Sequence, residues 1–297
     1  MPSIASSSNQ SQPAQRQEST ANNAPLLSAN VTVRYPGKEP VLRGLSMDIR
    51  HGEVLGLIGQ SGSGKSTLAL AILGLLGRQH AVVEGKIIFQ QTDLLSMRES
   101  DLRNLRGRAL SLVLQSPLAS LNPALRIRTQ LQEAWRAHRV RTASQADCDK
   151  VVRSALTSVS LEASDEFLRK RPSQLSVGQA QRVLIAMAVL HRPALLIADE
   201  ATSALDVITQ SEILQLFRRL NREIGTSVLY ISHDLPSVAG ICDRIAILHE
   251  GQIVECGPTA HIFAAPSHPY TQRLLSSLPQ LPMRAEGLAK ASSATKA

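Results

Sequence analysis

The chain has 297 residues, 43% of them hydrophobic and 19% charged, which is enough apolar material for a large folded domain and excludes a chain disordered throughout. The net charge of +8 suits an acidic partner or surface, whereas an aromatic content of 3% argues against stacking platforms for single-stranded nucleic acid. The three cysteines are far apart and no apolar run reaches the ~20 residues of a membrane span, so we expect neither a disulfide framework nor a transmembrane helix.

The two ends of the chain differ in composition from its middle. Residues 1–28 are dominated by Ser, Gln, Asn, Ala and Pro, and residues 283–297 are similar. Such segments bury too little apolar surface to offset the entropy lost on ordering. We therefore expect a disordered tail over 1–28, one folded domain over 29–282 and a flexible tail over 283–297.

Between the tails, short β-like runs alternate with helical ones. Strands are predicted at 53–59, 85–90, 110–115, 194–199, 227–232 and 244–250, several of them apolar throughout, as in strands covered on both faces. Helices are predicted at 66–76, 179–190 and 209–224. This alternation predicts an α/β fold with right-handed parallel units. Residues 120–178 interrupt it with helical stretches at about 127–138 and 145–159, which we interpret as a helical insertion.

The stretch GQSGSGKST at 59–67 follows an apolar strand and precedes a helix, which is the context that a P-loop requires. Glycines let successive backbone N–H groups surround phosphate oxygens, and the helix N-terminus adds the positive end of its dipole. Lys65 is expected to reach the β- and γ-phosphates of a nucleotide, and the Ser66 hydroxyl to bind Mg²⁺. The predicted phosphate-binding residues are Gly59, Gln60, Ser61, Gly62, Ser63, Gly64, Lys65, Ser66 and Thr67.

A second element, ALLIADE at 194–200, is an apolar strand that ends in two acids. Paired acids at a strand end are often part of an ordinary turn. In a chain that also has a P-loop, the same pattern is typical of P-loop NTPases. Asp199 is then expected to hold Mg²⁺ through water, and Glu200 to face the γ-phosphate and polarise the attacking water.

The segment LSVGQ at 175–179 lies between these two elements and leads into a helix. In this order the three segments resemble ABC-type ATPases, over about residues 29–280. The resemblance implies a P-loop NTPase fold, an ABC-type ATPase cassette with a RecA-like core, an antiparallel β subdomain and a helical subdomain at about 120–178. It also implies that two cassettes pair head to tail, so that Ser176, Gly178 and Gln179 act on the partner's nucleotide. The family usually has glycine at Val177, where we expect valine to be tolerated although it resists positive φ.

Further residues match the family's motifs one at a time. Gln115, after the strand LSLVLQ, resembles the glutamine that touches Mg²⁺ and the attacking water, and His233 in YISHD the histidine that contacts the γ-phosphate. Asp206 in SALD resembles part of the loop that communicates between cassettes, and Tyr35 in VRYPG the aromatic residue that stacks on adenine. With ATP and Mg²⁺ as the implied cofactors, the catalytic residues would be Glu200, His233 and Gln115, and the metal ligands Ser66, Gln115 and Asp199.

Two stretches narrow the family. QSPLASLNP at 115–123 and IFAAPSHPYTQRLLSSLP at 262–279 are similar to the peptide and nickel importer branch. This implies an ATP-hydrolysing subunit, peripheral on the cytoplasmic face of the cell membrane, that powers uptake of a peptide, nickel or similar solute. The implied partners are a second ATPase, identical or different, integral membrane permease subunits and, indirectly, an extracytoplasmic solute-binding protein, but no nucleic acid. We interpret His268-Pro269-Tyr270 as a rigid turn without chemistry.

Residues 98–141 hold nine arginines and only three acids. In the family this region receives a coupling helix of the permease. We expect part of the block, including Arg126 and Arg128, to dock that helix or nearby anionic headgroups. A solvated basic face is the alternative.

A different class stays open, namely an ATPase subunit of a soluble multi-enzyme complex similar to the carbon–phosphorus lyase accessory proteins, which is not a transporter. A kinase or GTPase fits less well, because the chain has no NKxD segment. Some members of the importer branch carry a C-terminal cysteine cluster for an iron–sulfur centre. No cysteine follows Cys256, so we expect no cluster here.

Overall fold

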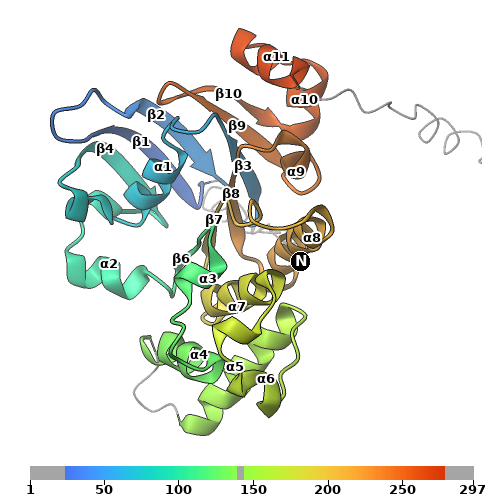
Figure 1. Cartoon of the computed structure of the whole chain (residues 1–297). Coiled ribbons are helices and arrows are strands. Elements are labelled where there is room, and N and C mark those ends of the chain that lie inside the picture. The colour runs from blue at the N-terminus through green and yellow to red at the C-terminus, as the bar shows by residue number, and fades with distance from the viewer. Residues whose placement is uncertain (1–23, 139–143, 278–297) are drawn as a thin grey trace, which may run out of the picture.

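A computed structural model of the chain describes residues 24–138 and 144–277 (Figure 1). Most of the predicted N-terminal tail, all of the predicted C-terminal tail, and Arg139 and Arg141 of the arginine-rich block lie outside the described residues. Within the described ranges, no helix combines the length and the apolar character needed to cross a membrane.

The central sheet has six strands in the order β10-β9-β3-β8-β7-β6. All neighbours pair in parallel except β10, which is antiparallel to β9. Every residue of β3 and β8 is buried, which explains why β3 has no polar side chain and why β8 has serine only at its two ends, around the apolar run VLYI. The bounds are β3 Val54–Ile58, β6 Leu110–Val113, β7 Leu195–Asp199, β8 Ser227–Ser232, β9 Arg244–His249 and β10 Gln252–Pro258.

A second, antiparallel sheet has the order β2-β1-β4-β5, with β1 Leu27–Arg34, β2 Leu42–Ile49, β4 Val82–Phe89 and β5 Thr92–Asp93. The segment 85–90, predicted to belong to the parallel units, instead lies mostly in β4 and pairs antiparallel with β1. The burial of β1 alternates, so it covers the core with one face only. Because β1 begins at Leu27, the last two residues of the predicted tail belong to the folded domain.

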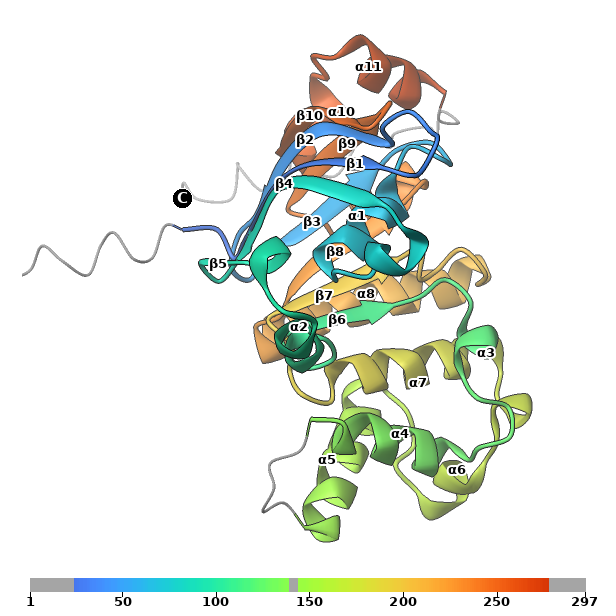
Figure 2. The ribbon, with the colours of Figure 1, turned by 90° about the vertical axis from the view of Figure 1, so that its left-hand side faces the viewer.

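Helices lie on both faces of the central sheet, with α1 on one face and α7 and α8 on the other, whereas α4, α5 and α6 lie beyond α7, and α10 and α11 lie by β9 and β10 (Figure 2). Leu55 and Leu57 of β3 belong to a core shared with α1 and the antiparallel sheet, whereas Val54 and Ile58 face a core shared with α4, α5, α7 and α8. The helices are α1 Lys65–Ile72, α2 Glu99–Leu105, α3 Pro117–Ser120, α4 Ile127–Arg136, α5 Gln145–Ser158, α6 Asp165–Arg169, α7 Val177–Val189, α8 Val207–Ile224, α9 Leu235–Ala239, α10 Thr259–Ala264 and α11 Pro269–Ser276, with 3₁₀ turns at Leu76–Gln79, Leu94–Ser96 and Pro172–Gln174.

Several arginines of the basic block are used inside the fold. Arg106 donates to Leu73 O at 2.6 Å and pairs with Glu99. Arg128 pairs with Asp165 at 2.5 Å, so it holds α4 to α6 rather than projecting freely. Arg126 is exposed. The ion pair gives Arg128 a structural role within the helical subdomain, and the docking role expected of Arg126 and Arg128 stays a prediction.

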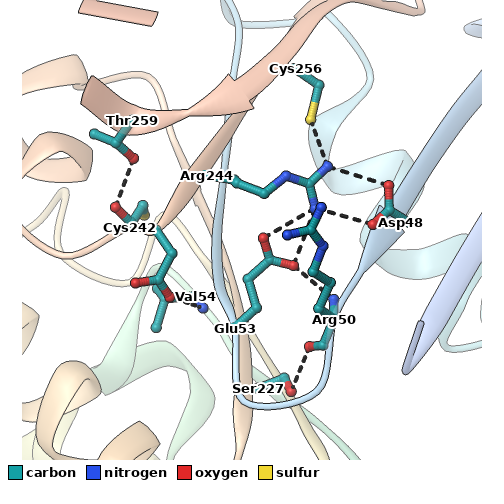
Figure 3. Close-up of polar contacts among 10 residues, drawn as sticks. Asp48, Arg50, Glu53, Val54, Ser227, Cys242, Arg244, Cys256 and Thr259 are labelled. Atoms are coloured by element: carbon teal, nitrogen blue, oxygen red, sulfur yellow. Dashed lines mark hydrogen bonds and ion pairs between the residues drawn. The ribbon is translucent and has the colours of Figure 1, made fainter. Parts of the chain in front are cut away.

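The amino-terminal edge of the central sheet is closed by a charge network (Figure 3). Arg244, the first residue of β9, donates to Asp48 of β2 and to Glu53 just before β3, both at 3.1 Å. Glu53 is 6% exposed and its second oxygen accepts from Arg50 N at 2.7 Å. The Arg244 guanidinium also donates to Cys256 Sγ at 3.3 Å. Arg244 thus links β2 of the antiparallel sheet to β3, β9 and β10 of the central sheet.

Candidate active site

The carboxyl ends of four parallel strands meet at the other edge of the central sheet. β8 lies between β3 and β7, and β6 follows β7. The P-loop follows β3, Asp199 ends β7, His233 follows β8 and Gln115 lies two residues beyond β6. Crevices at this edge of parallel α/β sheets are the usual ligand sites. The fold therefore brings the predicted P-loop and water-positioning residues to one edge.

The P-loop backbone needs glycine at both of its ends. A Cβ atom at Gly59 would lie 2.4 Å from the Leu248 carbonyl oxygen and 2.7 Å from Ser63 Oγ. Gly64 has φ +106°, and a Cβ atom there would lie 2.6 Å from Leu42 Cδ2. Side chains at these positions would push the loop out of shape, so its curvature depends on these glycines.

Lys65 opens α1 and folds back over the loop. Its Nζ donates to the carbonyl oxygens of Gly59 at 2.8 Å and Gln60 at 2.9 Å. The residue is 5% exposed. Burial lowers the pKa of Lys65, while the carboxylates of Glu200 and Asp199 act to raise it. The ammonium therefore lies between the loop and the acids of β7, where the phosphates of a nucleotide are expected.

Tyr35, the predicted adenine-stacking residue, lies beside Thr67 in the first turn of α1. The Tyr35 hydroxyl lies 3.5 Å from Thr67 Oγ1. Tyr35 follows β1 and is half-buried, so the antiparallel sheet supplies a flat ring beside the P-loop helix. The other loop residues, Gln60 and Ser61, are exposed and leave the backbone accessible.

Asp199 has the character of a metal ligand. Its Oδ1 atom is buried and has no hydrogen-bond partner among the described residues. Burial raises the pKa of Asp199 and Glu200 acts in the same direction, while the Ser66 hydroxyl and Lys65 oppose the rise. Hard oxygen donors of this kind, one carboxylate and one hydroxyl, are how Mg²⁺ is held together with substrate phosphates. The described residues contain no cluster of three or more His, Cys, Asp or Glu able to hold a metal without such help.

Glu200 and His233 form a pair beside this position. Glu200 Oε1 lies 3.3 Å from His233 Nδ1. Glu200 has a left-handed backbone with φ 48°, and its N–H donates to Ile231 O at 3.0 Å across to β8. A non-glycine residue in this region of φ is uncommon and is often found at functional sites. The strained turn aims the carboxylate at the strand edge, where it can polarise a water molecule.

A pocket of about 300 Å³ opens between the two residues. Ser203 belongs to the SALD segment and Ser232 and Asp234 flank His233 in YISHD, whereas Thr202 and Gln210 were not singled out in the sequence. Gln210 of α8 donates to Asp234 at 3.2 Å and so closes the far side of this pocket. The lining residues other than Glu200 and His233 are Thr202, Ser203, Gln210, Ser232 and Asp234.

The signature segment lies at the start of α7. Ser176 caps the helix, because its hydroxyl accepts from Gln179 N at 3.1 Å and the Gln179 side chain accepts from Ser176 N at 3.1 Å. The Gln179 amide oxygen is thus used within the cap. Val177 is the first residue of α7 and has no positive φ, so the backbone here does not require glycine. A Cβ atom at Gly178 would lie 2.8 Å from Thr209 Cγ2 of α8.

Asp206 belongs with the signature segment rather than with the P-loop. It caps α8 by accepting from Ile208 N at 3.1 Å and Thr209 N at 3.0 Å. No hydrogen bond or ion pair within the described ranges joins Ser176, Gly178 or Asp206 to the P-loop. Since α7 and α1 lie on opposite faces of the sheet, one chain does not bring these predicted residues together with its own P-loop.

Comparison with known proteins decides the family. A family model described as ABC transporter matches residues 42–203, more than half of the chain. The chain belongs to the ABC transporter family. A second model, the oligopeptide/dipeptide transporter C-terminal region, matches residues 254–296 of this ABC cassette.

Curated relatives of this ABC cassette carry transport functions in their names. It is 41% identical to the dipeptide transport ATP-binding protein DppD of Bacillus subtilis, over 83% of this chain and 73% of DppD. It is 39% identical to the oligopeptide transport ATP-binding protein OppD of Salmonella typhimurium, over 88% of this chain and 80% of OppD. It is also 39% identical to the glutathione import ATP-binding protein GsiA of Salmonella typhimurium, of whose length it spans 41%.

Solved cassettes share its fold. The dimeric cassette MJ0796, in a post-hydrolysis state bound to ADP and Pi, superposes with a TM-score of 0.68 at 28% identity, over 78% of this chain and 98% of that one. The predicted α/β P-loop fold with its antiparallel sheet is confirmed. This ABC cassette is an ATPase subunit.

Proposed function

We propose that this ABC cassette powers peptide import and is held on the cytoplasmic face of the cell membrane by its permease. The observation that carries the peptide class is the match of residues 254–296 to the C-terminal region of oligopeptide and dipeptide transporters. The relatives DppD and OppD are named for dipeptide and oligopeptide transport. None of the relatives described supports the alternative of a soluble multi-enzyme complex.

The P-loop holds the phosphates of ATP in this proposal. Its backbone N–H groups surround the phosphate oxygens, and Lys65 exchanges the carbonyls of Gly59 and Gln60 for the β- and γ-phosphates. Tyr35 stacks on adenine, which is supported by its position beside Thr67. The partner cassette completes the cage with its own signature segment.

Mg²⁺ fits the oxygen donors of this edge and, when bound to Ser66 and Asp199 with Gln115 nearby, would neutralise charge on the β- and γ-phosphates. Glu200 polarises the attacking water, and His233, paired with it at 3.3 Å, keeps that carboxylate in line with the γ-phosphate. The left-handed turn at Glu200 fixes the direction of attack before the nucleotide binds.

Replacing Glu200 with Gln tests this assignment. Turnover should fall by about 10²–10⁴-fold because the base is lost, while ATP affinity is retained and an ATP-bound dimer accumulates on size exclusion. Glu223→Gln, an exposed carboxylate on α8, is the matched control and should keep full activity. Turnover of Glu200→Gln at the control's rate would show that another group positions the water.

The second cassette is proposed to dock at the α7 and α8 N-termini. Val207 and Ile208, directly after Asp206, are 82% and 75% exposed, which is unusual for large apolar side chains. The relative MJ0796 is dimeric. Docking there would bring Ser176 and the first N–H groups of α7 over the partner's γ-phosphate, where a hydroxyl and a helix N-terminus favour an anion.

The permease is proposed to dock in an apolar groove of about 370 Å³ between the core and the helical subdomain, lined by Leu114, Leu184 and Met187 among others. Leu114 is 46% exposed and precedes Gln115, so occupancy of the groove can be sensed at the active site. Leu114→Arg should release the cassette from membranes that contain its permease, and Arg126→Glu should weaken the attachment. Arg34→Glu, an exposed arginine on the antiparallel sheet, is the control. Undiminished co-purification of Leu114→Arg would refute docking in this groove.

A further inference from the structure

The HPY turn, His268–Tyr270, packs on the end of β9. The Tyr270 ring stacks on the His249 imidazole, with centroids 3.7 Å apart and 16° between the planes. Tyr270 is 5% exposed, and its hydroxyl is buried without a hydrogen-bond partner among the described residues. The contact is therefore made by the ring and not by the hydroxyl.

The turn that carries Tyr270 is held by one carboxylate. Glu255 of β10 accepts from Ser267 N at 2.8 Å, from Ser267 Oγ at 2.7 Å and from His268 N at 3.1 Å. His268 Nδ1 in turn accepts from Tyr270 N at 3.2 Å and caps α11. The ring of Tyr270 consequently has a fixed position relative to β10.

His249 lies beside the start of the P-loop. β9 pairs in parallel with β3, with Ile247 opposite Ile58, so the next residues of both strands reach the same edge. The Leu248 carbonyl abuts Gly59 so closely that a Cβ atom on the glycine would lie 2.4 Å from it.

The turn after His249 reaches the other end of the P-loop. Gly251 O accepts from Arg43 N at 2.9 Å, and a Cβ atom on Gly251 would lie 2.3 Å from Val41 O. Leu42 in turn packs against Gly64, where a Cβ atom would lie 2.6 Å from Leu42 Cδ2. Both terminal glycines of the P-loop thus rest on one support, residues 41–42 and 248–251, which we name the P-loop platform.

We propose that Tyr270 is a positioning residue for ATP binding, which fixes the P-loop platform by stacking on His249. The inference rests on the proposed role of the P-loop in holding the phosphates. Glycines have no side chains to anchor the loop, so the atoms that abut them set its curvature. A displaced platform would spread the backbone N–H groups and weaken their fit to the phosphate oxygens.

Calorimetric binding of Mg·ATP to the full chain tests the proposal. Tyr270→Ala and His249→Ala should each raise Kd by about fivefold, the effect expected from loss of one aromatic pair, and the double variant should be no worse than either single one. Tyr270→Phe should bind as wild type. The KM for ATP should rise with Kd while kcat at saturating ATP stays unchanged. Arg273→Ala, exposed on the same helix, is the control.

A wild-type Kd in folded Tyr270→Ala would overturn the proposal, as would a defect in Tyr270→Phe equal to that of Tyr270→Ala. If Tyr270→Ala fails to fold, His249→Ala decides, because that side chain is 28% exposed and its truncation is milder. Lys65→Ala separates the two levels of inference. Loss of binding with Lys65→Ala but not with His249→Ala refutes only the positioning role, whereas unchanged binding with Lys65→Ala refutes the role of the P-loop itself.

Discussion

The two edges of the central sheet use polar groups in opposite ways. At the amino-terminal edge, Arg244 satisfies Asp48 and Glu53 with hydrogen bonds at 3.1 Å. At the carboxyl-terminal edge, Asp199 Oδ1 and Ser63 Oγ are buried with no hydrogen-bond partner among the described residues. Unsatisfied buried polar atoms destabilise a fold, by about 1–3 kcal/mol each.

The difference shows how one sheet can supply both stability and a binding site. The charges of the amino-terminal edge are neutralised inside the chain and hold two sheets together. The polar atoms of the other edge have no such partners, which suits the proposed binding of phosphate oxygens and a cation there. Substitutions at the carboxyl-terminal edge should therefore lower ATP turnover but not stability, and substitutions at the amino-terminal edge should lower stability but not ATP binding.

The largest effect is expected for Asp199→Asn. We expect ATP turnover to fall by roughly 10³-fold, or about 4 kcal/mol, because the metal's charge stabilisation is lost. Thermal stability should be unchanged or raised, since the substitution removes the negative charge of a half-buried carboxylate whose Oδ1 atom has no hydrogen-bond partner among the described residues. Turnover assays and calorimetric melting measure the two quantities. A lowered melting temperature would contradict the contrast between the edges.

A smaller effect, of opposite kind, is expected for Arg244→Met. Removing one partner of this network leaves Glu53 buried without its cation, which costs about 3 kcal/mol of unfolding free energy. Mg·ATP affinity should be retained, because the network lies at the far end of the sheet. Urea denaturation and nucleotide titration check both parts, with the exposed Arg34→Met as control. The contrast fails if Arg244→Met weakens ATP binding without lowering stability.

The smallest effect, on unfolding free energy, is expected for Glu255, whose carboxylate accepts hydrogen bonds from the turn that carries Tyr270. Burial acts to raise its pKa, but hydrogen bonds from Ser267 and His268 outweigh this and lower the pKa to about 2. Because the folded pKa lies below the unfolded value, the stabilisation is present above pH ~4.5 and is lost as the pH falls toward 2.

Solvent screening at this partly exposed site reduces the contribution to about 1 kcal/mol. Urea midpoints of wild type and Glu255→Gln should therefore differ at pH 6, and the difference should shrink at pH 3.5. A difference that is equal at both pH values would show that Glu255 does not remain ionised through this range.

The fold class was predictable because the decisive patterns are local. β3 and the middle of β8, Val228–Ile231, are buried on both faces and form unbroken apolar runs. The P-loop spacing is contained in nine residues, so its glycines could be assigned without any long-range contact. β1 and β2 were not identified from their own residues, because each buries one face and alternates with polar positions. The antiparallel sheet came from the family resemblance alone.

Long-range pairing explains what the sequence could not indicate. Arg244 meets Asp48 across 196 residues, and no local pattern marks either residue as a partner. Arg128 was assigned to a docking face because its partner, Asp165, lies 37 residues later on another helix. The roles of the individual site residues stay predictions until the variants are measured.

If Lys65 binds the phosphates as proposed, its hydrogen bonds to the carbonyls of Gly59 and Gln60 affect the free energy of nucleotide binding and release. The Lys65 ammonium loses two hydrogen bonds to its own loop when it moves to a phosphate. The net gain in binding free energy is therefore the difference between the new interaction with the phosphate and these two hydrogen bonds. The same carbonyls compete for the cation when ADP departs. In the proposed site, these carbonyls would take the ammonium back when ADP leaves, so that Lys65 would not be left buried without a hydrogen-bond partner.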